Sequence, residues 1–369
     1  MKNLEFQMFV KEIEKKLKLC GGYSIGIVKN GEIDDIFCSG YSDINQRQAV
    51  NKNTKFPLSC LTKGLTALLA YDSLDVDIPL KEYCKMSFNN SYVTDNITLR
   101  DLLCHRSGIY PNTLWTYLMR EKEVCETVDD LPRLKSESFR KKYIYSNYGF
   151  SLVSYVLECL YKKSYESILG VETLKKMGIE DFLFYEKDNS KNKRNIEAKP
   201  YFYDGEKYVD GETLNVHLLN SASGIILDIE EALKILLYLI RISNLKEYNN
   251  FFIPNILSDV GKLYKEVGYE KYALGLYHKE VYGYDVYYHN GYIVGYSSFI
   301  GFVPRLQSGI IVLCNNEKTV FPRIVAYKAL EMHLGMNGSN WCNRLLREQR
   351  CGEYSRMAFI EEIQKSNNT

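Results

Sequence analysis

The distribution of strand-forming segments is the feature of this sequence that most restricts its fold. Runs rich in β-branched and aromatic residues occur near both ends of the chain, at residues 23–28, 33–38, 272–277, 285–289, 297–303 and 309–314. The part between them has mostly helical periodicity and few strand signals. We therefore expect a sheet domain formed by residues 1–75 and 200–369, and an inserted helical domain formed by residues 76–199.

The expected fold class is α/β (α+β), with an antiparallel sheet of five or more strands and helices on both of its faces. The first two strands are separated by Lys29-Asn30-Gly31, whose Asn-Gly pair is a strong hairpin signal. Helical periodicity predicts helices at residues 1–19, 60–71, 99–104, 114–123, 148–161, 165–177 and 320–333.

Charge and cysteine content restrict the partners and the compartment. The 47 Lys and Arg residues nearly balance the 46 Asp and Glu residues, so no net field steers the chain onto nucleic acid. The ten cysteines include no Cys-x-x-Cys pair, and we expect neither a metal site nor a cofactor. No apolar run approaches the roughly 18 to 20 residues of a membrane span, and the first 19 residues lack a signal-peptide pattern. A cytoplasmic protein with mostly free thiols is predicted, and its oligomeric state stays open.

The segment Cys60-Leu61-Thr62-Lys63 places a thiol and an amine at positions i and i+3 of a predicted helix start. Side chains with this spacing share one face, so the amine can take or polarise the thiol proton. The helix N-terminus also stabilises the anion that forms. The same spacing occurs at Ser138-x-x-Lys141, Cys159-x-x-Lys162, Ser190-x-x-Lys193 and Ser243-x-x-Lys246. None of those pairs lies at a helix start, which favours Cys60 and Lys63.

Three elements in the same order resemble the active site of class C β-lactamases, DD-peptidases and related esterases. Residues 56–63 resemble the Ser-x-x-Lys segment of that family, with Cys60 in place of the serine. Tyr145-Ser146-Asn147 resembles the Tyr-x-Asn element, and His289-Asn290-Gly291 resembles the Lys-Thr-Gly or His-x-Gly element. Further similarities occur at residues 102–108, 221–224 (usually Ala-Gly-Gly) and 295–304. The resemblance covers about residues 20–335 and implies a β-lactamase/transpeptidase-like fold.

The resemblance also implies a role for each matched residue. Cys60 would attack a carbonyl carbon, and the backbone N–H groups of Cys60 and Tyr292 would hold the oxyanion. Tyr145 and Lys63 would transfer protons to the leaving group, with the larger share falling to Tyr145.

The remaining matched residues would bind the substrate. Asn147 would orient the substrate amide or the amine of the catalytic lysine, and His289 and Gly291 belong to the third element. Because His289 stands where the family often has Lys, a fixed cation for a substrate carboxylate is not expected. This departure argues against β-lactams and D-Ala-D-Ala peptides as substrates.

A thiol nucleophile changes the expected chemistry. A cysteine at a helix start and beside a cation ionises more readily than a free thiol, and its acyl intermediate is a thioester. Thioesters react readily with amines and thiols, which favours acyl transfer or amide processing over β-lactam hydrolysis. We therefore predict a hydrolase or acyltransferase for a small-molecule or peptide acyl substrate, with an amine or thiol as a candidate acceptor.

Three alternatives stay open. The chain could be a catalytically disabled, ligand-binding relative in which Cys60 only packs, since buried cysteines are often inert. Cys60 could be an introduced replacement for a natural serine. Ser59 could be the nucleophile, although its i to i+4 spacing to Lys63 is one residue out of register with the family. His105 is expected to be a structural residue rather than a catalyst.

Overall fold

The computed structural model describes residues 2–109, 119, 122–134, 137–188, 190–191, 196–204, 206–258, 270–317, 319–335, 342–343 and 345–347. Most of the predicted helix at residues 114–123 lies outside these residues.

The strands and helices follow the chain in a mixed order. The strands are β1 (Gly22–Lys29), β2 (Glu32–Asp43), β3 (Gln48–Ala49), β4 (Phe56–Pro57), β5 (Tyr201–Tyr203), β6 (Tyr208–Asp210), β7 (Ile226–Leu227), β8 (Ile256–Leu257), β9 (Lys271–Tyr272), β10 (Tyr277–Val281), β11 (Tyr284–Ile293), β12 (Tyr296–Val303) and β13 (Ser308–Cys314). The α-helices are α1 (Lys2–Lys16), α2 (Thr62–Ser73), α3 (Ser91–Asn96), α4 (Leu99–Leu103), α6 (Asn147–Tyr161), α7 (Tyr165–Leu169), α9 (Asn220–Ser223), α10 (Ile229–Ile242), α11 (Asn249–Phe252) and α12 (Phe321–His333).

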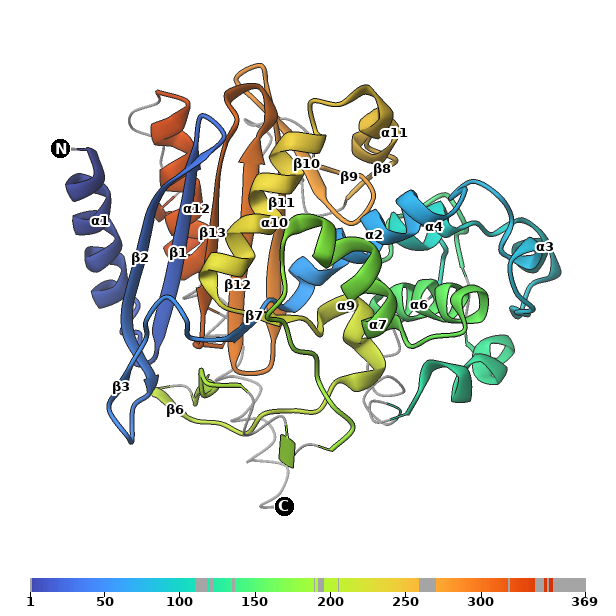
Figure 1. Cartoon of the computed structure of the whole chain (residues 1–369), viewed down its shortest axis with the longest axis horizontal. Coiled ribbons are helices and arrows are strands. Elements are labelled where there is room, and N and C mark those ends of the chain that lie inside the picture. Colours follow the sequence, from blue (N-terminus) through green and yellow to red (C-terminus); the bar gives the residue numbers. More distant parts are fainter. Residues whose placement is uncertain are drawn as a thin grey trace, which may run out of the picture.

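The two ends of the chain form one antiparallel sheet. Within the described residues it has nine strands in the order β3-β2-β1-β13-β12-β11-β10-β9-β8. Strand β1 pairs with β13 from Tyr23 opposite Cys314 to Val28 opposite Gly309, so an N-terminal strand lies beside a C-terminal one (Figure 1). The predicted antiparallel sheet and the α/β fold class are confirmed.

The turn between β1 and β2 follows directly from its sequence. Asn30 has a φ of 53° and Gly31 a φ of 79°. Both central positions of a type I′ hairpin turn need positive φ, which Asn and Gly tolerate best. The predicted hairpin is therefore present.

Helices cover both faces of the sheet, and the strand sequences alternate to match. Helix α10 packs on β1 and β13 from one side, while α12 packs on β12 and β13 from the other, with α1 against α12. Along β13, Ile311 and Leu313 join the core beneath α10, whereas Ile310 and Val312 join the core beneath α12. This two-residue period is what a strand buried on both faces requires.

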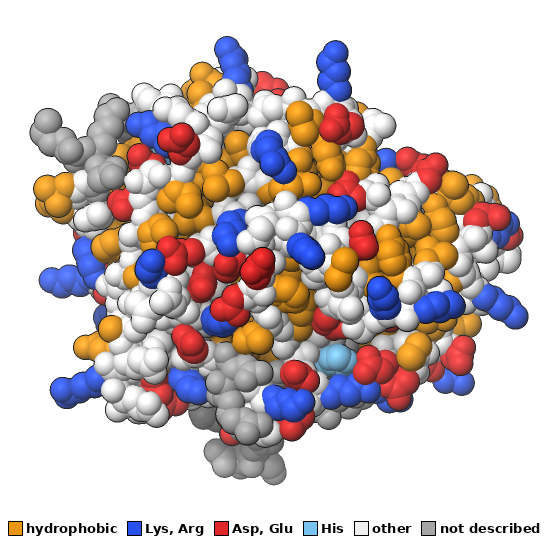
Figure 2. Space-filling model, in the orientation of Figure 1, with side chains coloured by type: hydrophobic (Ala, Val, Ile, Leu, Met, Phe, Trp, Pro, Cys, Tyr) orange, Lys and Arg blue, Asp and Glu red, His pale blue; other side chains and the backbone are white. Residues whose placement is uncertain are grey.

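Helix α2 connects the sheet to the helical part of the molecule. Helices α4, α6, α7 and α9 pack around it on the right of the sheet in Figure 1. The domain boundaries at residues 75 and 200 stay a prediction. Among the described helices, none is long and apolar enough to cross a membrane. Basic and acidic side chains intermingle over the face of the molecule in Figure 2.

The predicted strand at residues 272–277 is wrong in its middle. Strand β9 ends at Tyr272 and β10 begins at Tyr277, and the residues between them turn, with the Ala273 N–H donating to the Leu276 carbonyl at 2.8 Å. Gly275 has a φ of 69°, and a Cβ at this position would lie 2.6 Å from the Lys63 carbonyl oxygen. The turn is therefore set by close contact with α2, which strand propensity does not report.

Candidate active site

Cys60 lies in a short turn that leads into α2. Residues Ser59–Leu61 form a 3₁₀ turn after β4, and α2 begins at Thr62. The α-helix thus starts two residues later than predicted. The N–H of Leu58 donates to the Ile225 carbonyl at 2.9 Å, which fixes the turn to the segment before β7.

The residue before Cys60 has an unusual backbone conformation. Ser59 has a φ of 56°, a region that costs a non-glycine residue about 1–3 kcal/mol. Its hydroxyl is buried, and no described residue hydrogen-bonds to it. Such positions concentrate at functional sites, where surrounding contacts hold them. Here the conformation turns the chain between β4 and the helix that carries Lys63.

Three helices converge on the ammonium group of Lys63. Its Nζ donates to Asn147 Oδ1 at 2.7 Å and to the Ala222 carbonyl at 3.0 Å. It also lies 4.8 Å from the centre of the Tyr145 ring and 5.4 Å from that of Phe150, within cation–π range. The Lys63 side chain has no exposed surface. Helix α2 supplies the lysine, while the start of α6 and helix α9 supply its oxygen partners.

The Cys60 thiol is surrounded by polar groups from four parts of the chain. Its Sγ lies 3.7 Å from the Tyr292 carbonyl oxygen in β11 and 4.0 Å from Ser223 Oγ in α9. The Lys63 charge and the Tyr145 hydroxyl also act on this thiol and lower its pKa. The structure therefore groups Cys60, Lys63, Tyr145 and the backbone of Tyr292 in one place. The catalytic roles expected for them stay a prediction.

The electrostatics of this cluster favour an ionised thiol. Burial alone raises the pKa of Cys60, but the Lys63 charge and the hydrogen bonds from Tyr145 and Ser223 outweigh burial, and the pKa is lowered. Burial lowers the pKa of Lys63, against the attraction of Cys60. Burial followed by the Cys60 charge raises the pKa of Tyr145 well above its usual range. Tyr145 therefore keeps its proton at neutral pH.

His289 is neutral in this site. Burial and then the Lys63 charge lower its pKa to about 3. Its Nδ1 lies 2.6 Å from the Asn290 carbonyl, which can only accept, so Nδ1 carries the proton. Its Nε2 then accepts from the Tyr272 hydroxyl at 2.9 Å. His289 thus supplies no positive charge to a substrate carboxylate.

Gly291 allows β11 to pack against the turn that carries Cys60. A Cβ at Gly291 would lie 1.8 Å from Ser298 Oγ and 2.8 Å from the Leu58 carbonyl oxygen. Two hydrogen-bonded atoms occupy that space, because Ser298 Oγ donates to the same Leu58 oxygen at 2.8 Å. The glycine is therefore required by close approach of the backbone.

His105 contacts the segment of the candidate site that contains Tyr145 and Ser146. Its Nδ1 accepts the N–H of Ser146 at 3.1 Å, and its ring lies 4.3 Å from the Tyr145 ring, centre to centre. It is completely buried, and this burial lowers its pKa well below the usual value. The contact fixes the segment that presents Tyr145 and Asn147.

Sequence reasoning missed three groups that contact the predicted residues. They are the Ala222 carbonyl, the Ser223 hydroxyl and the Tyr272 hydroxyl. The segment 221–224 carried a family signal, but spacing alone did not indicate that its residues reach Cys60 and Lys63. Tyr272 had no signal that separated it from the other 30 tyrosines.

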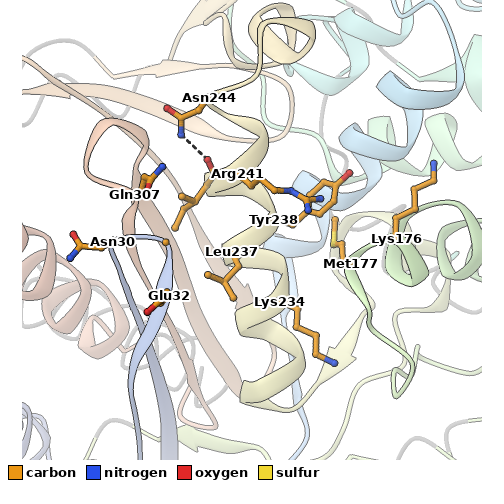
Figure 3. A pocket seen from close by; sticks show the side chains of 12 residues that line it. Asn30, Glu32, Lys176, Met177, Lys234, Leu237, Tyr238, Arg241, Asn244 and Gln307 are labelled. Carbon is orange, nitrogen blue, oxygen red and sulfur yellow. Dashed lines mark hydrogen bonds between the residues drawn. The ribbon is translucent and has the colours of Figure 1, made fainter.

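Two cavities are described, and Cys60 does not line either of them. One of about 530 Å³ lies between α10 and the β1–β2 turn, and Figure 3 shows Tyr238, Arg241 and Lys234 on its helical wall. The other, of about 280 Å³, is lined by Asn290, Tyr292 and the start of α12. Within the described ranges, no three His, Cys, Asp or Glu side chains are grouped to hold a metal ion.

An antiparallel sheet lies between helices, and Cys60 and Lys63 lie where the chain enters helix α2. This arrangement is that of the β-lactamase-like class of hydrolases. Residues 10–332 match the Beta-lactamase family, and the chain belongs to that family. The predicted family and the predicted enzyme class are confirmed.

The individual relatives and solved structures described next share less than a quarter of their aligned residues with this chain. Protein flp of Staphylococcus aureus (strain MRSA252) is 24% identical over 334 residues, which cover 83% of this chain and 62% of that protein. The chain thus spans less than two thirds of that relative. The octameric penicillin-binding protein homologue from Pyrococcus abyssi has a TM-score of 0.80 at 20% identity, covering 93% of this chain and 80% of its own. The D-amino acid amidase from Ochrobactrum anthropi SV3 has a TM-score of 0.72 at 17% identity, and the match covers 90% of this chain and 98% of the amidase chain.

Proposed function

We propose that this protein is a covalent acyl-enzyme hydrolase or acyltransferase in which Cys60 is the nucleophile. The observation that carries the proposal is the position of the Cys60 thiol, whose Sγ lies 3.7 Å from the Tyr292 carbonyl oxygen and 4.0 Å from Ser223 Oγ. The Lys63 charge lowers the pKa of this thiol despite its burial. The substrate is an amide, ester or thioester, from a small peptide or a biosynthetic acyl intermediate. We also propose that it acts in the cytoplasm, away from peptidoglycan cross-links.

In the first step the Cys60 thiolate attacks the substrate carbonyl carbon. A carbon–sulfur bond forms, and the carbonyl electron pair moves to oxygen. We assign the oxyanion to the N–H groups of Cys60 and Tyr292. In an extended strand, the N–H and C=O of one residue point to the same side. Because the Tyr292 carbonyl faces Cys60, its N–H lies on that side too.

In the second step Tyr145 acts as the acid. Its raised pKa keeps the phenol protonated, so it can donate that proton to the leaving amine, alcohol or thiol as the carbonyl re-forms. The resulting phenolate lies beside the Lys63 ammonium, which stabilises it. Tyr145 then accepts the proton of the incoming acceptor, which attacks the thioester and releases Cys60. Asn147 holds the Lys63 ammonium through this cycle.

The proposed function is tested by comparing the wild type with Cys60→Ala and Cys60→Ser on p-nitrophenyl esters, aminoacyl anilides and acyl thioesters. We expect Cys60→Ala to lose turnover by at least about 10³-fold, because no covalent intermediate can form. Intact-mass spectrometry should find a substrate-derived acyl group on wild-type Cys60. Equal rates for the three proteins would contradict the proposal.

One observation favours the alternative of a disabled, ligand-binding relative. Cys60 is only 8% exposed, as an inert packing cysteine would be. Iodoacetamide separates the two functions, because a thiolate reacts and a packed thiol does not. The enzyme requires labelling of Cys60 before the other nine cysteines. Labelling of the more exposed cysteines while Cys60 stays unreacted would favour the ligand-binding alternative.

A further inference from the structure

We propose that Ser223 is a further catalytic residue, whose hydroxyl donates a hydrogen bond to the Cys60 thiolate. The inference rests on the proposed function, since it concerns the same nucleophile. Ser223 stands outside the three elements that resemble the family's active site, and its place in α9 is 163 residues further along the chain. It reaches the nucleophile only through the fold.

Ionisation of Cys60 fixes the direction of the hydrogen bond between it and Ser223. Ser223 Oγ lies 4.0 Å from Cys60 Sγ, and either atom could donate while the thiol is neutral. A thiolate can only accept, so the serine hydroxyl becomes the donor once Cys60 ionises. Ser223 is 4% exposed, and water therefore competes little for its proton. A donor in such a site stabilises the charged form of its partner.

The fold holds Ser223 at this distance. Helix α9 and the residues after it are tied to successive turns of α2, the helix that Cys60 precedes. The ties are Thr66 Oγ1 to the Ser221 carbonyl at 2.5 Å, Lys63 Nζ to the Ala222 carbonyl at 3.0 Å, and the Ile225 N–H to Thr62 Oγ1 at 3.4 Å. Hydrogen bonds on both sides of Ser223 prevent it from moving away from the nucleophile without breaking at least one of them.

Two departures from the family pattern meet at this contact. Cys60 stands where the resembling segments have serine, and Ser223 stands in a segment that usually reads Ala-Gly-Gly. A glycine has no side-chain donor, so the contact depends on the serine at position 223. A thiolate needs stabilisation as a resting anion, whereas a serine hydroxyl stays neutral until it attacks. The extra hydroxyl therefore suits a cysteine nucleophile.

The test is the pH dependence of Cys60 alkylation by iodoacetamide in the full chain, followed by peptide mass spectrometry. For Ser223→Ala we expect the midpoint to move upward and the rate near pH 7 to fall about tenfold, the effect of losing one hydrogen bond to a charged group. Ser221→Ala is the matched control. It lies in the same helix and is equally buried, and no described residue hydrogen-bonds to its hydroxyl, so the wild-type profile is expected.

The outcomes separate this inference from the proposed function. A Ser223→Ala profile that coincides with the wild type, while wild-type Cys60 still titrates below an ordinary thiol, overturns the role of Ser223 alone. Wild-type Cys60 that reacts no faster than the other cysteines overturns the proposed function. If Ser223→Ala does not fold, Ser223→Gly makes the same comparison, because it also removes the donor and restores the residue usual in the family.

Discussion

A buried lysine and a buried cysteine in contact share one proton between them, and the environment decides which form prevails. Burial penalises the thiolate of Cys60 and the ammonium of Lys63 separately, while their attraction favours both charges together. Two oxygen acceptors, Asn147 Oδ1 and the Ala222 carbonyl, hydrogen-bond to the Lys63 amine, and acceptors of this kind favour the charged form. Groups that contact Lys63 rather than the sulfur therefore also influence the charge of Cys60.

Lys63→Met tests this coupling, because methionine has a similar shape and no charge. We expect the midpoint of Cys60 alkylation to rise and the rate near pH 7 to fall by roughly tenfold or more, since the largest stabilising charge is gone while the burial penalty remains. Iodoacetamide kinetics across pH measure the effect. Lys234→Met is the control, because it removes a lysine from the α10 cavity rather than from the site. An unchanged midpoint in Lys63→Met would remove Lys63 from the activating role.

At the scale of elements, the site depends on how closely β11 approaches the turn before α2. The pairing of β10 with β11 ends at Tyr288, so the rest of β11, from His289 to Ile293, lacks a β10 partner and packs on the Cys60 turn instead. We call this contact between residues 289–293 of β11 and the turn at Ser59–Leu61 the seam, and it places the Tyr292 backbone beside the Cys60 thiol. Its width is set by Gly291, which leaves no room for a side chain.

Gly291→Ala should therefore damage both the site and the fold. We expect a loss of about 1–3 kcal/mol in the free energy of unfolding from overpacking, together with loss of turnover as Tyr292 moves from Cys60. Urea denaturation and the ester assay measure the two effects. Gly64→Ala is the matched control, because a Cβ there meets Leu276 at an ordinary 3.6 Å, and helix propensity favours alanine by about 1 kcal/mol. Similar outcomes for both variants would contradict the role of the seam.

The elements also show where sequence reasoning succeeds. The Asn30-Gly31 turn is predictable because its φ angles are dictated locally. The start of the β9–β10 turn at Tyr272 is not, because the aromatic run continues and only contact with α2 breaks the strand. Cys60 and Lys63 could be paired from spacing along one helix. Ser223 could not, because its contact with Cys60 joins two segments through tertiary packing.

At the scale of the whole molecule, strands from the two ends of the chain pair in one sheet. Strands β1 and β13 are adjacent in the sheet although nearly the whole chain separates them, so many native contacts join residues far apart in sequence. Contacts between residues far apart in sequence slow folding, because a long loop must close before they contribute. The site lies where α2, β11 and α9 meet, and it is complete only when the sheet and the helical part are both in place.

Stability of the whole fold should fall in mild acid because of His289. Its pKa drops from 6.5 to about 3 in the folded chain through burial and the Lys63 charge, so the unfolded chain binds one more proton between these values. The stabilisation by neutral His289 is therefore complete above about pH 6.5 and is lost progressively as the pH falls toward 3.

For His289→Gln, which cannot titrate, we expect a weaker dependence of unfolding free energy on pH. Relative to the wild type, the variant should gain about 1.4 kcal/mol between roughly pH 7.5 and pH 5.5, as linkage requires for one histidine. Urea denaturation at each pH gives these energies. The difference between the two proteins at about pH 7.5 and above serves as the internal control, because His289 is neutral in both states there and the difference should stay constant. If the plots of unfolding free energy against pH for the two proteins stayed parallel down to pH 5.5, His289 would be protonated in the folded chain. The conclusion that His289 is neutral in the site would then be wrong.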